Sequence, residues 1–495
     1  MKSAFKFILL NGLIFLALIA QAEVTIEGSI TFNESKMDIS NVCFEIYDHY
    51  LSPQSTPPKT IVCPVNAKGE FSLVFKPENK LFYIGIYFTN RQSQEVFPIE
   101  TKLLHKKFIY EDQDYLKVSL NVRGKWISFR GKGSEKLDCQ YQMASELMSQ
   151  AISSRITSLK NSHRYDENFK FQQIMRDTRW AIQKQILETY RSTMTEQVFE
   201  HISSQVRFDQ EYYYLKILAY DYSAGIPAQR SAAIRFFKQQ YANDLPLPKD
   251  GPIATLSSEY YLYLYKLNWL RVEFEEFPEG HAFERVSMKK FYEHLTSNYS
   301  GLTLHHLLLL FFTESGKQQN EVMSYYLPTI AVLPDGFSRK LLVKWHQRFT
   351  EFHDQDFSLT DESGKTVKLN TLRGKVLVID FWFNGCQGCL EMTPSIEKLI
   401  NDFSYNQDVL FISINTDDLR KFQDGIKMGG YTSDKQLILY TSGMARQHPL
   451  LKYIGIDFYP TIMIIGKDGN LISSRAPNPR IDNGAALKRM ISDAL

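Results

Sequence analysis

The spacing of apolar residues changes twice along this 495-residue chain, so three different kinds of structure are expected. From 23 to 132 apolar and polar residues alternate, which predicts an all-β, sandwich-like module with antiparallel strands. From 133 to 352 the apolar spacing is helical, which predicts an α-helical region packed as an irregular bundle or array. From 353 to 495 apolar strands alternate with helices, which predicts an α/β domain with a largely parallel sheet and an antiparallel hairpin at one edge. The expected fold class is therefore multidomain.

The charge balance excludes one class of partner. The chain has 57 Lys and Arg residues against 55 Asp and Glu residues, which gives a formal net charge of +2. Binding a nucleic acid through its phosphates needs a large basic surface, and this near-neutral balance does not supply one. We therefore expect no nucleic-acid partner.

Residues 1–22 have the pattern of a secretory signal peptide. Two lysines, Lys2 and Lys6, precede an apolar run from Phe7 to Ile19, and Ala20-Gln-Ala22 is a small-x-small cleavage site. The alternative is an uncleaved membrane anchor, but the apolar run is shorter than the ~20 residues that a spanning helix needs. The sequence thus predicts export, and the mature chain would then meet an oxidising environment.

Five cysteines occur in the chain, and three of them lie outside the C-terminal region. Cys43 and Cys63 lie on two predicted strands, and a hairpin centred near Pro53 would place them opposite each other. This symmetry predicts a structural disulfide, and two buried thiols are the alternative. Cys139 has no evident partner.

The remaining two cysteines belong to a segment whose residue order indicates thiol chemistry, Asp380-Phe-Trp-Phe-Asn-Gly-Cys386-Gln-Gly-Cys389. A predicted strand ends, a short loop follows, and the two cysteines open a helix. The amide groups and the positive dipole end at a helix N-terminus stabilise a thiolate, so Cys386 is the expected nucleophile. Cys389, one turn further along, can attack a mixed disulfide on Cys386 and close a redox-active disulfide.

From Phe357 to the C-terminus the sequence resembles the thioredoxin fold, and more closely the exported TlpA/ResA-like thiol-disulfide oxidoreductases. Several motifs occur in the family's order: the hairpin from Phe357 to Gly364, the strand Asp380-Phe381-Trp382, the helix proline Pro394, and the loop Tyr459-Pro460-Thr461. The segment from Thr416 to Lys435 fills the place of the extra element that separates such proteins from plain thioredoxin.

The resemblance implies roles for further residues. Pro460 would be a cis-proline that turns the backbone of Tyr459 toward the dithiol, where it pairs with an extended substrate. We place Trp382 with these two as a substrate-binding residue. Asp380, buried beneath the site, would have a raised pKa and take the proton of Cys389, although a carboxylate without a catalytic part is the alternative.

Two departures from the family pattern leave the direction of electron flow open. Gly385 stands where the family usually has tryptophan, and the intervening pair Gln387-Gly388 contains no proline. This pair tunes the first thiol and so the reduction potential. A zinc site would need further ligands near the dithiol, and none has suitable spacing, so we expect no metal and no dissociable cofactor.

These observations predict an exported thiol-disulfide oxidoreductase that exchanges disulfides with protein or peptide thiols. The expected location is the periplasm or cell envelope of a Gram-negative bacterium. Turnover would need an upstream redox partner, and a membrane-borne one would suit that location; oligomerisation stays open. The alternative is a binding or scaffold protein of the envelope whose thioredoxin-like domain is redox-inactive.

Overall fold

The computed structural model describes most of the chain beyond residue 22, and the predicted signal peptide at 1–22 lies outside the described residues. The described residues are 23–31, 39–52, 55–56, 58–90, 95–96, 107–121, 126–145, 150–223, 226–241, 257–278, 286–315, 319–445, 448–456 and 458–495.

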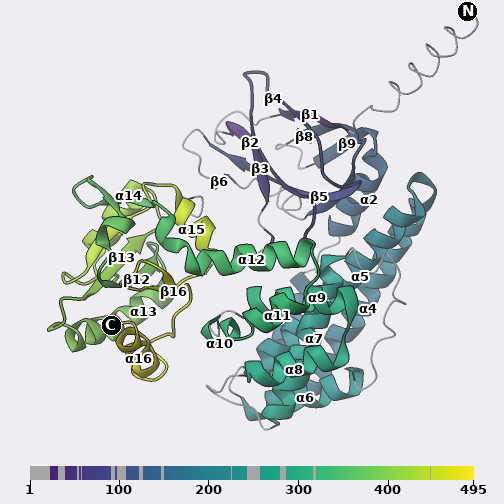
Figure 1. Cartoon of the computed structure of the whole chain (residues 1–495). Helices are drawn as coiled ribbons and strands as arrows, with labels where there is room; N and C mark the ends of the chain where they lie inside the picture. The colour runs from purple at the N-terminus through teal and green to yellow at the C-terminus, as the bar shows by residue number, and fades with distance from the viewer. Residues whose placement is uncertain are drawn as a thin grey trace, which may run out of the picture. The chain divides into compact units, whose positions relative to one another are not determined.

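The chain divides into two compact units, and Figure 1 draws the elements of both. The first unit comprises the described residues of Met1–Tyr50, Thr56–Thr157 and Gln172–Arg207. The second comprises those of Leu51–Ser55, Ser158–Phe171 and Phe208–Leu495. This division differs from the three predicted parts, because helical residues occur in both units. The predicted boundaries at 132 and 352 stay a prediction.

The described strands of the first unit form two sheets. One has the order β4-β1-β8-β9, and the other has the order β3-β2-β5-β6 with β7 paired to β5. Buried side chains from both sheets form one apolar cluster, in which Ile26 and Leu116 come from the first sheet and Phe44 and Phe82 from the second. The strands are β1 Val24–Thr31, β2 Asn41–Tyr47, β3 Lys59–Pro64, β4 Glu70–Phe75, β5 Leu81–Thr89, β6 Glu95–Val96, β7 Phe108–Glu111, β8 Tyr115–Asn121 and β9 Trp126–Lys132.

The strand pairing corrects two predictions for this part of the chain. Strands β1 and β8 pair in parallel, so the module is not wholly antiparallel. In the β2–β3 hairpin Cys43 pairs with Val62, while Cys63 pairs with Val42. Successive residues of a strand point to opposite faces, so this one-residue offset places the two thiols on opposite faces of the sheet. No disulfide joins them, and the predicted Cys43–Cys63 bond is wrong.

In each unit, the helices bury mainly aromatic and aliphatic side chains. In the second unit, buried Phe, Tyr and Leu side chains of α7, α9 and α12 belong to one large cluster. No helix within the described ranges is both long and apolar enough to cross a membrane. The helices are α2 Ser134–Ser145, α3 Gln150–Asn161, α4 Tyr165–Thr189, α5 Glu196–Ser223, α6 Pro227–Tyr241, α7 Ser258–Glu276, α8 Met288–Asn298, α9 Gly301–Thr313, α10 Gln319–Met323, α11 Tyr326–Val332 and α12 Phe337–Thr350.

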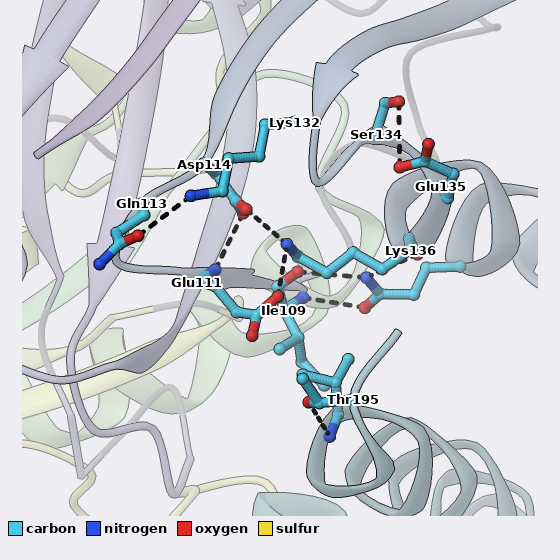
Figure 2. A network of polar contacts seen from close by, with 11 residues as sticks. Ile109, Glu111, Gln113, Asp114, Lys132, Ser134, Glu135, Lys136 and Thr195 are labelled. Carbon is cyan, nitrogen blue, oxygen red and sulfur yellow. Dashed lines mark hydrogen bonds and ion pairs between the residues drawn. The ribbon is translucent and has the colours of Figure 1, made fainter. Parts of the chain in front are cut away.

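A buried ion pair attaches α2 to the strands that precede it, as Figure 2 shows. The ammonium of Lys136 lies 2.5 Å from Oδ1 of Asp114 and 3.0 Å from Oε2 of Glu111. One turn later, the amide of Gln140 accepts the N–H of Ile109 and donates to its carbonyl oxygen. Burial raises the pKa of the Asp114 carboxyl, and the Lys136 charge opposes that rise. Because every group here has a partner, this network holds the helix to the sheet.

The α/β residues of the second unit form a seven-stranded sheet of order β11-β10-β14-β13-β12-β15-β16. Only the β12–β13 and β13–β14 pairs are parallel, and the other four are antiparallel. The sheet is therefore mixed, with antiparallel strands on both sides, rather than largely parallel with one edge hairpin. Its strands are β10 Ser358–Asp361, β11 Thr366–Lys368, β12 Val376–Trp382, β13 Val409–Asn415, β14 Leu437–Tyr440, β15 Thr461–Ile465 and β16 Leu471–Ser473.

Helices cover both faces of this sheet around its central strand, and β12 is buried along its whole length. Val376 and Val378 share a cluster with side chains of α13 (Gln387–Asp402) and α16 (Ala485–Asp493). The alternate residues Leu377 and Ile379 share the large cluster that includes side chains of α15 (Pro449–Ile454). Helix α14 (Leu419–Met428) packs near the end of β12 through Phe422. Asp380 follows the alternation of Val376 and Val378, so it lies on the α13 face.

Candidate redox-active site

Cys386 and Cys389 are joined in a disulfide at the start of α13, with an S–S distance of 2.01 Å and a Cα–Cα distance of 5.3 Å. Cys386 is the N-cap residue of the helix, and its Sγ accepts the N–H of Cys389 at 3.2 Å. The first turn of α13 contains no acidic residue that would oppose the positive end of the helix dipole. A thiolate on Cys386 would thus meet both a hydrogen-bond donor and a favourable dipole.

Asp380 lies on the buried strand β12, two residues before the end of the strand, and is 5% exposed. Burial raises the pKa of Asp380 to about 7, and the hydrogen bonds from Ser413 and Gln436 partly oppose the rise. The Ser413 hydroxyl donates to Oδ2 at 3.0 Å, and the Gln436 amide donates to Oδ1 at 2.6 Å. A carboxyl with this pKa can exchange a proton near neutral pH, as a general acid or base must.

Sequence reasoning named Asp380 but neither of its partners. Ser413 lies directly opposite Asp380 on the parallel strand β13, so correct strand pairing would have identified it. Gln436 belongs to the segment before β14, and its approach to Asp380 depends on how that segment folds back. No motif in the sequence signals it.

Cys389 lies against the end of β12. Its Sγ is 4.0 Å from the carbonyl oxygen of Phe381, the residue that follows Asp380 in the strand. Cys389 is 4% exposed, and Cys386 is 6% exposed. The second cysteine therefore faces the strand that carries the buried carboxyl, as a resolving thiol that loses its proton inward would require.

The predicted proline loop contacts the start of α13. The Tyr459–Pro460 peptide bond is cis. A Cβ atom on Gly388 would lie 3.1 Å from Cδ of Pro460, so the proline ring packs directly on the backbone between the two cysteines. The rings of Tyr459 and Phe383 pack nearly perpendicular to each other, with the centroids 5.3 Å apart. The structure thus brings Pro460 and Tyr459 to the dithiol from a distant part of the sequence.

Trp382 is buried, although the sequence analysis placed it among the substrate-binding residues. Its side chain is 1% exposed, and the indole stacks on the ring of Tyr431 with the centroids 4.6 Å apart. A ring without exposed surface cannot contact a substrate, and Trp382 instead belongs to the buried cluster that contains Cys386, Cys389, Phe422 and Tyr431. Within the part of the chain that the structure describes, no three His, Cys, Asp or Glu side chains group to hold a metal ion.

A protein-family model matches the C-terminal region of this chain. Residues 353–473 match the family model described as AhpC/TSA family. The thioredoxin-like protein YneN of Bacillus subtilis is 27% identical over 121 residues, which are 23% of this chain and 64% of YneN. The thiol-disulfide oxidoreductase ResA of Bacillus thuringiensis is 28% identical over 123 residues, which are 24% of this chain and 64% of ResA. The chain thus spans less than two thirds of these relatives' length.

Two solved bacterial thioredoxin structures are similar to part of this chain. The thioredoxin domain of a thiol-disulfide oxidoreductase from Bacteroides vulgatus is 21% identical, covers 28% of this chain and 92% of that chain, and has a TM-score of 0.24. The exposed lipoprotein thioredoxin of Streptococcus pneumoniae is 22% identical, covers 28% of this chain and 99% of that chain, and has a TM-score of 0.24. The family match to residues 353–473, the curated relatives and the mixed sheet described above together identify the C-terminal region of this chain as a thioredoxin-like domain.

Proposed function

We propose that this protein is an exported thiol-disulfide oxidoreductase that exchanges disulfides with protein or peptide clients through Cys386 and Cys389. One observation carries the proposal: the two cysteines form a disulfide at a helix N-terminus, and Cys389 contacts the strand that carries a buried carboxyl with a pKa of about 7. A structural disulfide needs no proton acceptor, whereas thiol exchange needs one whenever a thiol must become a thiolate.

The reaction consists of two exchanges. In the reduced protein, the Cys386 thiolate attacks a client disulfide, so a Cys386–client S–S bond forms and one client thiolate leaves. Asp380 then accepts the proton of Cys389, and the resulting thiolate attacks Sγ of Cys386. The internal disulfide closes and the second client sulfur leaves as a thiolate, which takes up a proton. Two electrons have then passed from the protein to the client, and the same steps in reverse oxidise a client dithiol.

A client would contact the surface on the Pro460 side of the dithiol. Phe458 is 42% exposed there, and the guanidinium of Arg475 lies 4.7 Å from the centroid of its ring. A small cavity beside Pro460 is lined by Phe458 and Arg475 together with Met392, Thr461, Ile462, Ala476 and Asn478. An extended client chain could pair with the backbone of Tyr459 and place one side chain over this cavity.

The proposal includes the cellular setting. The signal-like residues 1–22 would direct the chain to the periplasm or envelope, where a membrane-borne dithiol reductant or a disulfide-bearing oxidant would return the pair to its starting state. Residues 23–352 would select clients, attach the protein or mediate oligomerisation.

A redox titration against glutathione tests this proposal. We expect Cys386 and Cys389 to change together between dithiol and disulfide, in one two-electron transition, as the ratio of reduced to oxidised glutathione is varied. Thiol labelling with peptide mass analysis measures each cysteine. Cys139 is an internal control, because burial raises its pKa to about 12 and makes its thiol unreactive.

The position of the midpoint separates a reductase, with a low potential, from an oxidase or isomerase, with a higher one. A Cys386–Cys389 pair whose oxidation state ignores the glutathione ratio would contradict the proposal. It would favour the alternative, an envelope scaffold with a redox-inactive domain.

A further inference from the structure

Two side chains from the segment between β13 and β14 hold the backbone immediately before Cys386. The N–H of Asn384 donates to Oδ2 of Asp417 at 2.6 Å. The N–H of Gly385 donates to the hydroxyl oxygen of Tyr431 at 2.8 Å. These two amides lie between the end of β12 and the start of α13, so neither the sheet nor the helix supplies them with a partner.

Tyr431 is itself held firmly. It is 3% exposed, and its ring is nearly parallel to the Trp382 indole, with an interplanar angle of 10°. Helix α14 also contacts the indole, because a Cβ atom on Gly425 would lie 2.8 Å from Cζ3 of Trp382. The hydroxyl of Tyr431 is thus placed relative to β12 by packed rings.

Asp417 is oriented by its own neighbours. Its N–H donates to Oδ1 of Asn415 at 2.7 Å, and the Asn415 amide donates back to Oδ2 of Asp417 at 3.3 Å. Asn415 is the last residue of β13, next to β12 in the sheet. Both supports of the loop before Cys386 therefore rest on rigid parts of the domain.

The loop needs such support because its conformation is unusual. Gly385 has φ +96°, a backbone conformation that side-chain-bearing residues rarely adopt. Glycine has the largest conformational freedom of any residue, so an unsupported Gly385 would let Cys386 move relative to the helix behind it. The Tyr431 hydroxyl bonds the amide of this same residue.

We propose that Tyr431 is a positioning residue for the nucleophile: its hydroxyl holds Gly385 so that Cys386 Sγ stays at the N-terminus of α13. This inference rests on the proposed function and deepens it, because it assigns control of thiol reactivity to the segment between β13 and β14. The thiolate of Cys386 is stabilised by the first-turn amides, and that stabilisation falls off within one turn. Loosening the loop therefore makes the thiolate less stable.

Replacing Tyr431 with phenylalanine tests the proposal. Tyr431→Phe keeps the ring that stacks on Trp382, removes the acceptor of the Gly385 N–H, and leaves the net charge unchanged. We expect the midpoint of the pH dependence of Cys386 alkylation, measured on the reduced full chain with iodoacetamide and peptide mass analysis, to rise by about half a pH unit. Tyr405→Phe is the matched control, because Tyr405 is 82% exposed in the same domain and loses the same atom.

Hydrogen exchange distinguishes positioning from general damage to the fold. Positioning predicts faster exchange in Tyr431→Phe only at the amides around Gly385, whereas a damaged fold would show faster exchange along β12 as well. An alkylation midpoint that stays at the wild-type value, or falls, would overturn the proposal. The alkylation midpoint is a property of the thiol alone, so it tests the positioning role even if the protein fails to exchange disulfides with glutathione or a client.

Discussion

Cys386→Ser is expected to lower the protein-dependent rate of insulin disulfide reduction by about a thousandfold or more, so that only the background rate of the reductant remains. A serine hydroxyl at this position cannot form the mixed disulfide with which the exchange begins. The measurement is the turbidity of insulin after its chains separate, with the full-length protein and dithiothreitol as the electron source.

The matched control for this loss is Cys139→Ala, which removes a buried thiol of the first unit. Its insulin reduction rate should equal that of the wild type. If Cys386→Ser retains wild-type activity, the nucleophile lies elsewhere and the assignment of the site is wrong.

Asp380→Asn is expected to stabilise the domain and to slow its chemistry. The pKa of Asp380 in the folded protein is about 7, against an ordinary value of 3.8. Folding therefore favours the protonated form, and wild-type stability falls as the pH rises from about 4 to about 7. An asparagine never ionises, so its gain in the free energy of unfolding should be absent below pH 4 and reach up to about 4 kcal/mol above pH 7.

The same variant should resolve mixed disulfides about a hundredfold more slowly, because Cys389 loses its proton acceptor. Hydrogen exchange of the β12 and β13 amides in the full chain measures the stability change at pH 5 and pH 8. Asp424→Asn is the control, because it changes an exposed carboxyl on α14. A gain in stability that does not depend on pH would show that Asp380 is not the titrating group.

The local pattern of residues was enough to predict the structure of the segment that contains the two reactive cysteines. A buried strand, a short loop and two cysteines opening a helix follow from the order of apolar and polar residues between Asp380 and Cys389. The proline loop required the family resemblance, because nothing near Pro460 in the sequence points to a site more than seventy residues earlier. The structure places it against Gly388.

The wrong predictions for the β strands have a common cause. Each depended on which strands pair in the folded chain and in what register. The Cys43–Cys63 prediction assumed a hairpin symmetric about Pro53, and a one-residue offset in the pairing moved the two thiols to opposite faces. The parallel pairing of β1 with β8 joins segments far apart in the sequence.

The burial of Trp382 could likewise not be predicted from the sequence. An aromatic residue beside a reactive loop fits either a binding surface or a buried support, and the burial that decides between them comes from Tyr431 and α14. The hydrogen bond from Gln436 to Asp380 was hidden from the sequence for the same reason, because it depends on how the segment before β14 folds back toward β12.

Capture of a client on Cys386 is the most direct test of the central claim, that this dithiol exchanges disulfides with proteins. The variant Cys389→Ser cannot resolve the intermediate, so incubation of its reduced form with disulfide-bonded insulin should yield a covalent adduct. Peptide mass analysis should locate the bond at Cys386, dithiothreitol should release the insulin chain, and the double variant with Cys386→Ser should yield no adduct. If the reduced Cys389→Ser protein forms no adduct with insulin, the account of this protein as a thiol-disulfide oxidoreductase is contradicted.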